Sequence, residues 1–207
     1  MLPLASATAL LVTAFLLGSI PFGYLLYRLR TGGDIRAAGS GNIGATNVLR
    51  AAGVKLGLAT LALDALKGWL AVELALRFAG AHPALIASAL ALVVLGHMYS
   101  PWLRFRGGKG VATALGAFLA LAPLPMAEAL VVFAAVLAVW RYVSLASICA
   151  CIALPLLMLT SRTRFPAAEL ATASGLALLI IVRHRANLAR LRRGTENKLG
   201  TRAGAAI

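Results

Sequence analysis

Long apolar stretches recur along the whole chain and constrain its fold more than any other feature. Hydrophobic residues make up 61% of the 207 residues and charged residues only 13%, and the mean hydropathy is +0.89. A bilayer core about 30 Å thick needs about 20 helical residues. Seven runs qualify, at residues 4–27, 54–76, 83–99, 111–122, 126–140, 143–160 and 167–182. We therefore predict an all-α, polytopic membrane helix bundle of seven spans, formed as one domain over residues 1–207.

Two of these runs leave an alternative open. The run 111–122 is short for a span, and Pro123 and Pro125 separate it from the next run, because proline interrupts a helix. Residues 111–140 form either two spans or one re-entrant hairpin, and the hairpin gives a five-span count. The first run has neither a basic segment before it nor an A-x-A-like cleavage site, so we expect a retained span rather than a signal peptide.

The basic residues predict an orientation, because short loops rich in Lys and Arg stay in the cytoplasm. With seven spans and the N-terminus outside, the outer loops keep only Arg77, Arg162 and Arg164. The C-terminus and the polar loops then face the cytoplasm. The net charge of +14 lies in short stretches between apolar runs and not in one stripe, so we expect the lipid bilayer and phosphorylated substrates as partners, and no nucleic acid.

One acidic and one basic residue lie inside the second run. Asp64 and Lys67 are three residues apart, so their side chains meet on one helix face and offset each other's charge. We interpret them as a neutralised structural pair; alternatively, they orient the neighbouring polar loop from below.

The first polar loop, residues 39–50, reads GSGNIGATNVLR. Its glycines allow a backbone path that turns N–H groups toward one point, as in a phosphate cradle. Neutral donors surround that path, and Arg50 adds a planar fork suited to phosphate. The candidate ligands of this loop are Ser40, Gly41, Asn42, Thr46, Asn47 and Arg50. The alternative is a flexible glycine loop at a membrane surface.

The second polar loop ends in Gly107-Gly108-Lys109-Gly110 immediately before a predicted helix. Bare N–H groups, the positive end of the helix dipole and the Lys109 ammonium then meet one anion. The spacing does not match a Walker A loop. We expect Arg104 and Arg106, earlier in this loop, to contact lipid head groups.

The third polar patch lies at residues 141–147, and the tail adds His184-Arg185-Ala186-Asn187. On a continuing helix His184 and Asn187 share a face. The chain has no G-x-S-x-G elbow and few carboxylates in its loops. A site made of hydrogen-bond donors and cations, with no obvious general base, catalyses group transfer when the substrate already carries a good leaving group.

These segments together resemble the bacterial acyl-phosphate:glycerol-3-phosphate acyltransferase family. The residues that carry the resemblance are 40–50, 107–113, 141–147, 184–187 and 194–200, so it runs nearly end to end. One departure is Asn197, where the family pattern has proline, which leaves the conformation of the tail open.

The resemblance implies a multi-pass bacterial inner-membrane enzyme of phospholipid synthesis. It moves an acyl group from acyl phosphate to the 1-hydroxyl of glycerol 3-phosphate, giving lysophosphatidic acid and phosphate, without a metal or another cofactor. Carried over to this chain, the catalytic residues are Ser40, Arg50, Lys109 and His184. The substrate-binding residues are Gly41, Asn42, Thr46, Asn47, Gly107, Gly108, Gly110, Ser147 and Asn187.

As a hypothesis, the two glycine loops hold the acyl phosphate, and Arg50, Lys109, Ser147 and Asn187 hold the glycerol 3-phosphate. The proton of the attacking hydroxyl goes to a phosphate oxygen or to His184, which alternatively orients Asn187. The oligomeric state is open, with a monomer among the options. The rival functions are an anion transporter and a non-catalytic membrane scaffold. A transporter predicts inverted repeats and polar residues at mid-membrane, and the sequence has no such repeat.

Overall fold

The computed structural model of the protein describes residues 3–80 and 82–200, and all regular secondary structure in these ranges is helical. This confirms the predicted all-α class. The α-helices are α1 (Leu4–Ser19), α2 (Phe22–Thr31), α3 (Ala45–Ala52), α4 (Val54–Phe78), α5 (Pro83–Met98), α6 (Val111–Leu121), α7 (Pro123–Trp140), α8 (Val143–Thr160), α9 (Ala167–Arg183) and α10 (Arg185–Arg192), and two 3-10 turns lie at η1 (Ile35–Ala37) and η2 (Pro101–Leu103).

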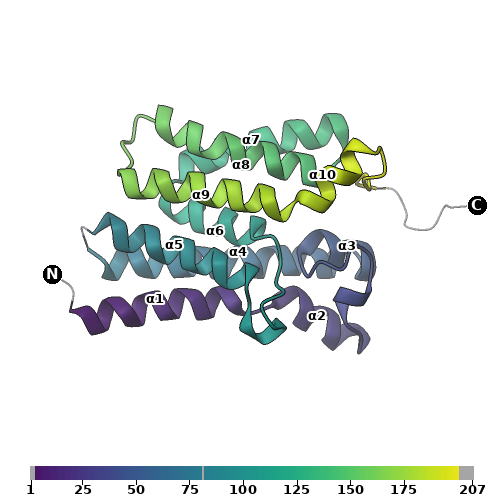
Figure 1. Ribbon diagram of the computed structural model, residues 1–207, viewed down its shortest axis with the longest axis horizontal. Coiled ribbons are helices and arrows are strands. Elements are labelled where there is room, and N and C mark those ends of the chain that lie inside the picture. Colours follow the sequence, from purple (N-terminus) through teal and green to yellow (C-terminus); the bar gives the residue numbers. More distant parts are fainter. Residues whose placement is uncertain (1–2, 81, 201–207) are drawn as a thin grey trace, which may run out of the picture.

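The long helices lie side by side in a bundle (Figure 1). The row of α1 and α2 forms one edge, α4, α5 and α6 lie in the middle, and α7, α8 and α9 form the other edge. The most extensive contacts join α4 to α6, α1 to α5 and α7 to α8. The short helices α3 and α10 lie at the same end of the bundle (Figure 1), which is also the end that carries the polar loops.

Glycine lets α1 and α5 pack with their backbones in contact. A Cβ added to Gly18 of α1 would lie 2.0 Å from the carbonyl oxygen of Val93, and one added to Gly96 of α5 would lie 2.3 Å from that of Phe15. Larger residues at either position would push the helices apart. Close approach through small residues is the usual way in which helices associate without a hydrophobic driving force.

The helices α4 and α6 show the same reciprocal arrangement. A Cβ on Gly68 of α4 would lie 2.0 Å from the carbonyl oxygen of Thr113, and one on Gly116 of α6 would lie 1.8 Å from that of Ala65. Two helix pairs are therefore held in register by glycines that face the partner backbone from both sides.

Each of the seven predicted runs contains a helix, but only some of these helices meet the length of a span. Four stretches are long and apolar enough to cross a membrane: Leu4–Thr31, which joins α1 and α2, then Pro83–Leu103, Pro123–Trp140 and Val143–Thr160. The pair α9 and α10 passes the same test only as a unit bent by 57°, and α6 is shorter. The structure thus gives four or five candidate spans among the described residues, and the seven-span count remains a prediction.

One predicted boundary was wrong. The first run is confirmed as a candidate span, Leu4–Thr31, within which α1 ends at Ser19 and α2 begins at Phe22. The fifth run begins at Pro123 and not at residue 126. Proline is accommodated in the first turn of a helix, where its missing N–H has no partner to lose, so Pro123 starts α7 instead of preceding it.

Several long helices end at one level, which we call the polar boundary. It is marked by Ser19 at the end of α1, Met98 at the end of α5 and Arg183 at the end of α9. Ser100 Oγ donates to the Ser19 carbonyl at 2.6 Å, and Arg183 Nη2 donates to the Met98 carbonyl at 2.9 Å. At a rise of about 1.5 Å per residue, the 16 residues of α5 span about 24 Å, close to the thickness of a bilayer core.

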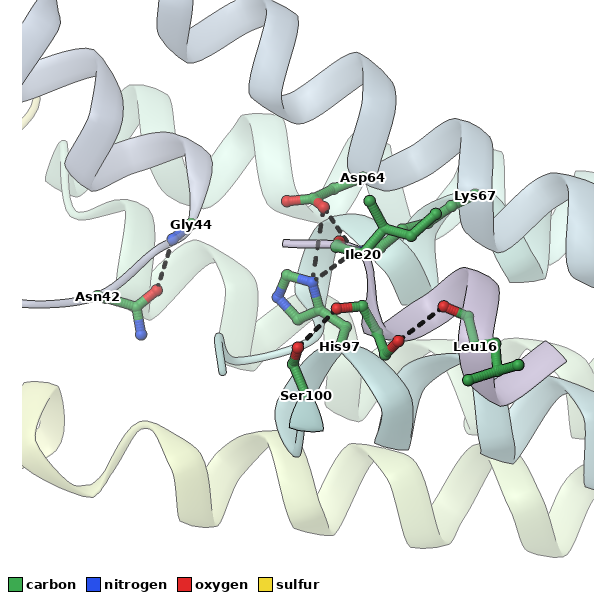
Figure 2. A network of polar contacts seen from close by, with 9 residues as sticks. Leu16, Ile20, Asn42, Gly44, Asp64, Lys67, His97 and Ser100 are labelled. Atoms are coloured by element: carbon green, nitrogen blue, oxygen red, sulfur yellow. Dashed lines mark hydrogen bonds and ion pairs between the residues drawn. The ribbon is translucent and has the colours of Figure 1, made fainter. Parts of the chain in front are cut away.

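The charged pair on α4 forms a buried cluster with a histidine of α5 (Figure 2). Lys67 Nζ lies 2.7 Å from Asp64 Oδ1 and 3.0 Å from His97 Nδ1, and it donates to the Ile20 carbonyl at 2.7 Å. Both charged side chains are 2% exposed. The predicted structural pair is confirmed. Sequence reasoning missed the other two partners, because His97 and Ile20 come from helices whose packing the sequence does not reveal.

We predict that Lys67→Met lowers the free energy of unfolding by about 3–5 kcal/mol, because it leaves the Asp64 carboxylate buried without a counter-charge. The double change Asp64→Leu with Lys67→Met should recover much of that loss, since it removes both charges. Denaturant unfolding in detergent micelles measures the effect. A double variant no more stable than the single one would contradict this account of the pair.

Candidate active site at the polar boundary

Asn47, at the start of α3, holds the first glycine loop in shape. Its Nδ2 donates to the carbonyl oxygens of Ala38 at 2.9 Å and Asn42 at 2.8 Å, and its Oδ1 accepts the Ser40 N–H at 2.9 Å. The side chain is buried, and Gly39 has no room for a Cβ beside it. The polar atoms of Asn47 are therefore engaged by its own loop, which gives this predicted ligand the role of shaping the cradle.

The rim of the same loop remains accessible. Ser40 and Gly41 are exposed, Thr46 is half-buried in the first turn of α3, and Asn42 Oδ1 accepts the Gly44 N–H at 2.8 Å. Gly41 lies at a φ of +70°, in the left-handed region that favours glycine.

A cavity of about 680 Å³ brings the two predicted glycine loops together. Gly41 lines it from the first loop, Gly107 and Arg106 from the second, and Arg183 from the end of α9; its remaining lining residues are Asp34, Arg36, Ala37 and Phe105. The loops are about 65 residues apart in the sequence, yet they face one space. This supports the prediction that they form parts of one site.

In the second glycine loop, backbone N–H groups that were predicted to be free donate to carbonyl groups of the protein. Gly107 donates its N–H to the Met98 carbonyl and Gly108 donates to the His97 carbonyl, both at 3.1 Å. The expectation of bare N–H groups at Gly107 and Gly108 was therefore wrong. The donors without a partner within a helix lie further on, in the first turn of α6, which begins at Val111.

Arg183 fixes this second loop from the other side. Its Nη2 donates to the carbonyl oxygens of Gly108 at 2.8 Å and Gly107 at 3.2 Å, besides that of Met98. Its guanidinium also lies over the Tyr99 ring, 5.2 Å from the centroid. Sequence reasoning did not select Arg183 as a site residue, because nothing in the sequence shows that the end of α9 meets this loop.

Gly108 connects the loop to the buried cluster on α4 and α5. A Cβ at this position would lie 2.1 Å from His97 Nε2, so only glycine fits over the ring. Gly110, two residues further along the chain, lies at a φ of +85° and precedes the first residue of α6. The loop therefore needs glycine at Gly108 for space and at Gly110 for backbone conformation.

Lys109 and Asn187, predicted separately, are joined in the structure. Lys109 Nζ donates to Asn187 Oδ1 at 2.5 Å. Burial, reinforced by Arg190, Arg50 and Arg183 nearby, lowers the pKa of Lys109 to about 8, although the Glu196 carboxylate opposes the shift. The ammonium is therefore charged at neutral pH and loses its proton as the pH rises through about 8.

Glu196 organises the residues beside Lys109. Its Oε1 accepts from Asn187 Nδ2 at 2.7 Å and Ser144 Oγ at 2.9 Å, and its Oε2 accepts from Arg190 Nε at 2.7 Å. Sequence analysis placed Glu196 in the matching tail segment but did not select it as a site residue. Its signal was its position as the only carboxylate in the polar tail, residues 183–200.

Ser147, the predicted serine of α8, lies one turn beyond Ser144. It is buried, and its Oγ donates to the Val143 carbonyl of its own helix at 2.8 Å. Within the described residues, Ser144 and not Ser147 is the serine that joins the network around Glu196.

The tail segment after α10 folds back over the site. Arg50 Nη2 donates to the Asn197 carbonyl at 3.2 Å. Arg141 and Leu199 exchange two bonds, with the Leu199 N–H donating to the Arg141 carbonyl at 2.7 Å and Arg141 Nη2 donating to the Leu199 carbonyl at 2.8 Å. The tail that the sequence left open at Asn197 thus runs from Glu196 across to α3 and the turn between α7 and α8.

His184 presents one ring nitrogen for hydrogen-bond acceptance. Nδ1 lies 2.8 Å from the Ile180 carbonyl, and since a carbonyl only accepts, Nδ1 carries the hydrogen and neutral Nε2 carries a lone pair. Burial and the Lys109 charge lower the pKa of His184 to about 4. The continuing helix predicted here was wrong, because the chain bends by 57° between α9 and α10 at this residue.

We predict that Glu196→Ala releases the tail, because three donors lose their shared acceptor and Arg190 loses its counter-charge. The free energy of unfolding should fall by about 3 kcal/mol, and trypsin should cleave after Lys198 faster than in the original protein.

Asn197→Ala is the matched control, since only the backbone carbonyl of Asn197 contacts Arg50. It should leave both readouts unchanged. Equal cleavage rates in the two variants would show that Glu196 does not hold the tail.

Comparison with known proteins shows which family this chain resembles. Residues 8–194 match the family described as glycerol-3-phosphate acyltransferase. A protein of that name from Syntrophotalea carbinolica is 48% identical over 189 residues, covering 91% of this chain and 95% of the relative. Another from Trichlorobacter lovleyi is 50% identical over 185 residues, covering 89% and 93%.

Two solved structures share the fold. One is a crystal structure of PlsY (YgiH), an integral membrane glycerol 3-phosphate acyltransferase, in its glycerol 3-phosphate form. It superposes with a TM-score of 0.90 at 42% identity, covering 95% of this chain and 96% of that one. The lysophosphatidic acid form gives a TM-score of 0.87 at 41% identity.

Proposed function

The chain belongs to the glycerol-3-phosphate acyltransferase family, and on that premise we propose that its acyl donor is an acyl phosphate. The acyl group moves to the 1-hydroxyl of sn-glycerol 3-phosphate and gives 1-acyl-glycerol 3-phosphate and inorganic phosphate. The transporter and scaffold alternatives lose their support, because the family is one of acyl-transferring membrane enzymes.

The observation that carries the donor assignment is the charge balance around Lys109. Arg50, Arg183 and Arg190 raise the local positive potential. Glu196, the carboxylate that opposes them, is already occupied by three donors. Such a site suits substrates that bring their own negative charge and an activated carbonyl. An acyl phosphate supplies both, and its phosphate resembles that of the acceptor.

The reaction then needs positioning more than acid–base chemistry. The 1-hydroxyl oxygen of glycerol 3-phosphate attacks the carbonyl carbon of the mixed anhydride, a new ester C–O bond forms, and the C–O bond to phosphate breaks. Inorganic phosphate leaves, and the hydroxyl proton leaves with it on a phosphate oxygen.

The low pKa of His184, about 4, supports the phosphate as proton acceptor. A base that weak is poorly matched to neutral pH, whereas the second pKa of a phosphate monoester is about 6. We assign the lone pair on His184 Nε2 to orienting the attacking hydroxyl.

We assign the two phosphates to two sides of the site. Lys109 and Arg50, with Asn187, hold the phosphate of glycerol 3-phosphate. The rim at Ser40 and Gly41 holds the acyl phosphate, beside the cavity that Gly41 lines together with Gly107. Thr46, Gly110 and Ser147 remain proposed substrate contacts. The acyl chain lies between helices in the lipid.

The orientation of the protein follows from its loops. We propose seven spans in the bacterial inner membrane, with the N-terminus outside and the site toward the cytoplasm, where basic loops remain and the soluble acceptor is present. The contacts of Arg50 and Arg141 with the tail support one polar side for all these loops.

The donor is tested with purified protein in lipid vesicles, supplied with glycerol 3-phosphate and either palmitoyl phosphate or palmitoyl-CoA. We expect lysophosphatidic acid and an equal amount of inorganic phosphate from palmitoyl phosphate alone. Product from palmitoyl-CoA but not from palmitoyl phosphate would overturn the assignment.

The same assay tests Lys109. Lys109→Ala should reduce kcat/KM at least about a hundredfold, the loss typical of a charged contact to a substrate phosphate. Lys55→Ala, which removes an exposed lysine on the same side, is the matched control and should retain full activity.

The titration of Lys109 predicts the pH dependence of the free enzyme. Because its pKa is lowered to about 8, the charged form needed to bind phosphate is lost as the pH rises, and kcat/KM should fall about tenfold per unit above pH 8. In Lys109→Arg the guanidinium keeps its proton, so the residual activity should not fall in that range. An unchanged alkaline limb in Lys109→Arg would assign it to another group.

A further inference from the structure

A second basic cavity lies beside the first and shares Arg36 and Arg106 with it, and none of its lining residues is assigned to catalysis. Its volume is about 470 Å³, and its lining residues are Arg36, Trp102, Leu103, Arg104 and Arg106. The base of the cavity is well packed, because Leu103 is buried and contacts Ile35, Ile43 and Val48 in a small separate core. The walls carry three guanidinium groups.

The loop that forms this cavity exposes aromatic side chains. Trp102 is 66% and Phe105 63% exposed. Phe105 and its neighbour Arg104 both lie at positive φ, 60° and 53°, a conformation that costs free energy for residues with a side chain. Bonds from the Arg104 and Phe105 N–H groups to the Pro101 and Ser100 carbonyls hold the turn. The unfavourable backbone conformations of Arg104 and Phe105 are thus part of a turn whose aromatic side chains are exposed.

This loop is placed at the polar boundary. Trp102 Nε1 donates to Ser19 Oγ at 2.8 Å, at the end of α1. In Figure 1 the segment between α5 and α6 projects sideways from the bundle near the junction of α1 and α2. Exposed aromatic rings at that depth are typical of the interface between head groups and acyl chains.

The net charge of the side chains that line the cavity indicates the chemical class of its ligand. Asp34 neutralises Arg36, with an Nη2 to Oδ2 distance of 2.6 Å. Arg104 and Arg106 have no carboxylate partner among the described residues, so two positive charges remain. A guanidinium pair beside an aromatic rim fits a phosphodiester whose lipid carries net negative charge.

We propose that this cavity binds the head group of one anionic phospholipid of the adjacent leaflet, with Trp102 against its glycerol and upper acyl region. The bound lipid lies on the loop that continues directly into Gly107 and Lys109. The proposed lipid site shares Arg36 and Arg106 with the cavity between the glycine loops, but its test requires no acyl donor.

The experiment is native mass spectrometry of the delipidated full-length protein in detergent, titrated with dioleoyl-phosphatidylglycerol or dioleoyl-phosphatidylcholine. We expect one phosphatidylglycerol to bind at least about tenfold more tightly than phosphatidylcholine. The variant R104Q, which leaves Arg106 of the neighbouring cavity in place, should lose this preference. The matched control R192Q removes an exposed arginine at the end of α10 and should keep it.

Three results would overturn the proposal. They are an unchanged preference in R104Q, an equal loss in R192Q, and displacement of phosphatidylglycerol by inorganic phosphate at equal concentration. The last result would assign the cavity to a soluble phosphate. Acyl transfer would remain measurable in each case, so failure here is distinct from failure of the proposed function.

A second measurement needs no arginine variant. Phosphatidylglycerol with brominated chains should quench tryptophan emission of the original protein more than brominated phosphatidylcholine does, and Trp102→Phe should abolish the difference. Equal quenching by the two lipids in the original protein would contradict a bound anionic lipid beside Trp102.

Discussion

Backbone polar groups have no water to bind inside an apolar bundle, and this constraint decides where the irregular chain of this protein can lie. The glycine loops, the turn at Arg141 and the tail all meet at the polar boundary. There, side chains satisfy their carbonyl groups: Asn47 binds the first loop, Arg183 the second, and Arg50 and Arg141 the tail. The site is held by donors that come from other segments.

Much of this arrangement could be predicted from the sequence because periodic and compositional signals are local. Apolar runs predicted where the long helices lie, and the spacing of Asp64 and Lys67 predicted their ion pair. The grouping of polar loops placed Lys109 and Asn187 on one side, where they contact each other. A predicted helix boundary was wrong where proline can play two roles. Pro123 was expected to interrupt a helix, and in the structure it separates α6 from α7 by being the first residue of α7.

The sequence could not show which polar groups are free to meet a ligand. A loop rich in donors looks the same whether its donors face substrate or their own backbone. Asn47 and the N–H groups of Gly107 and Gly108 turned out to be engaged within the protein. Glu196 was missed for the converse reason, since its importance comes from Ser144, Asn187 and Arg190, which only the folded chain brings around it.

The reciprocal glycine contacts determine how the protein responds to bilayers of different thickness. Helices that touch through Gly18 and Gly96, or through Gly68 and Gly116, cannot slide past one another without a backbone collision. When the surrounding bilayer thins or thickens, the protein therefore responds as a rigid unit, by tilting or by deforming the nearby lipid. The lipid composition can then change while the spacing between the polar loops stays constant, which suits a member of a family whose reaction contributes to the lipids of the surrounding bilayer.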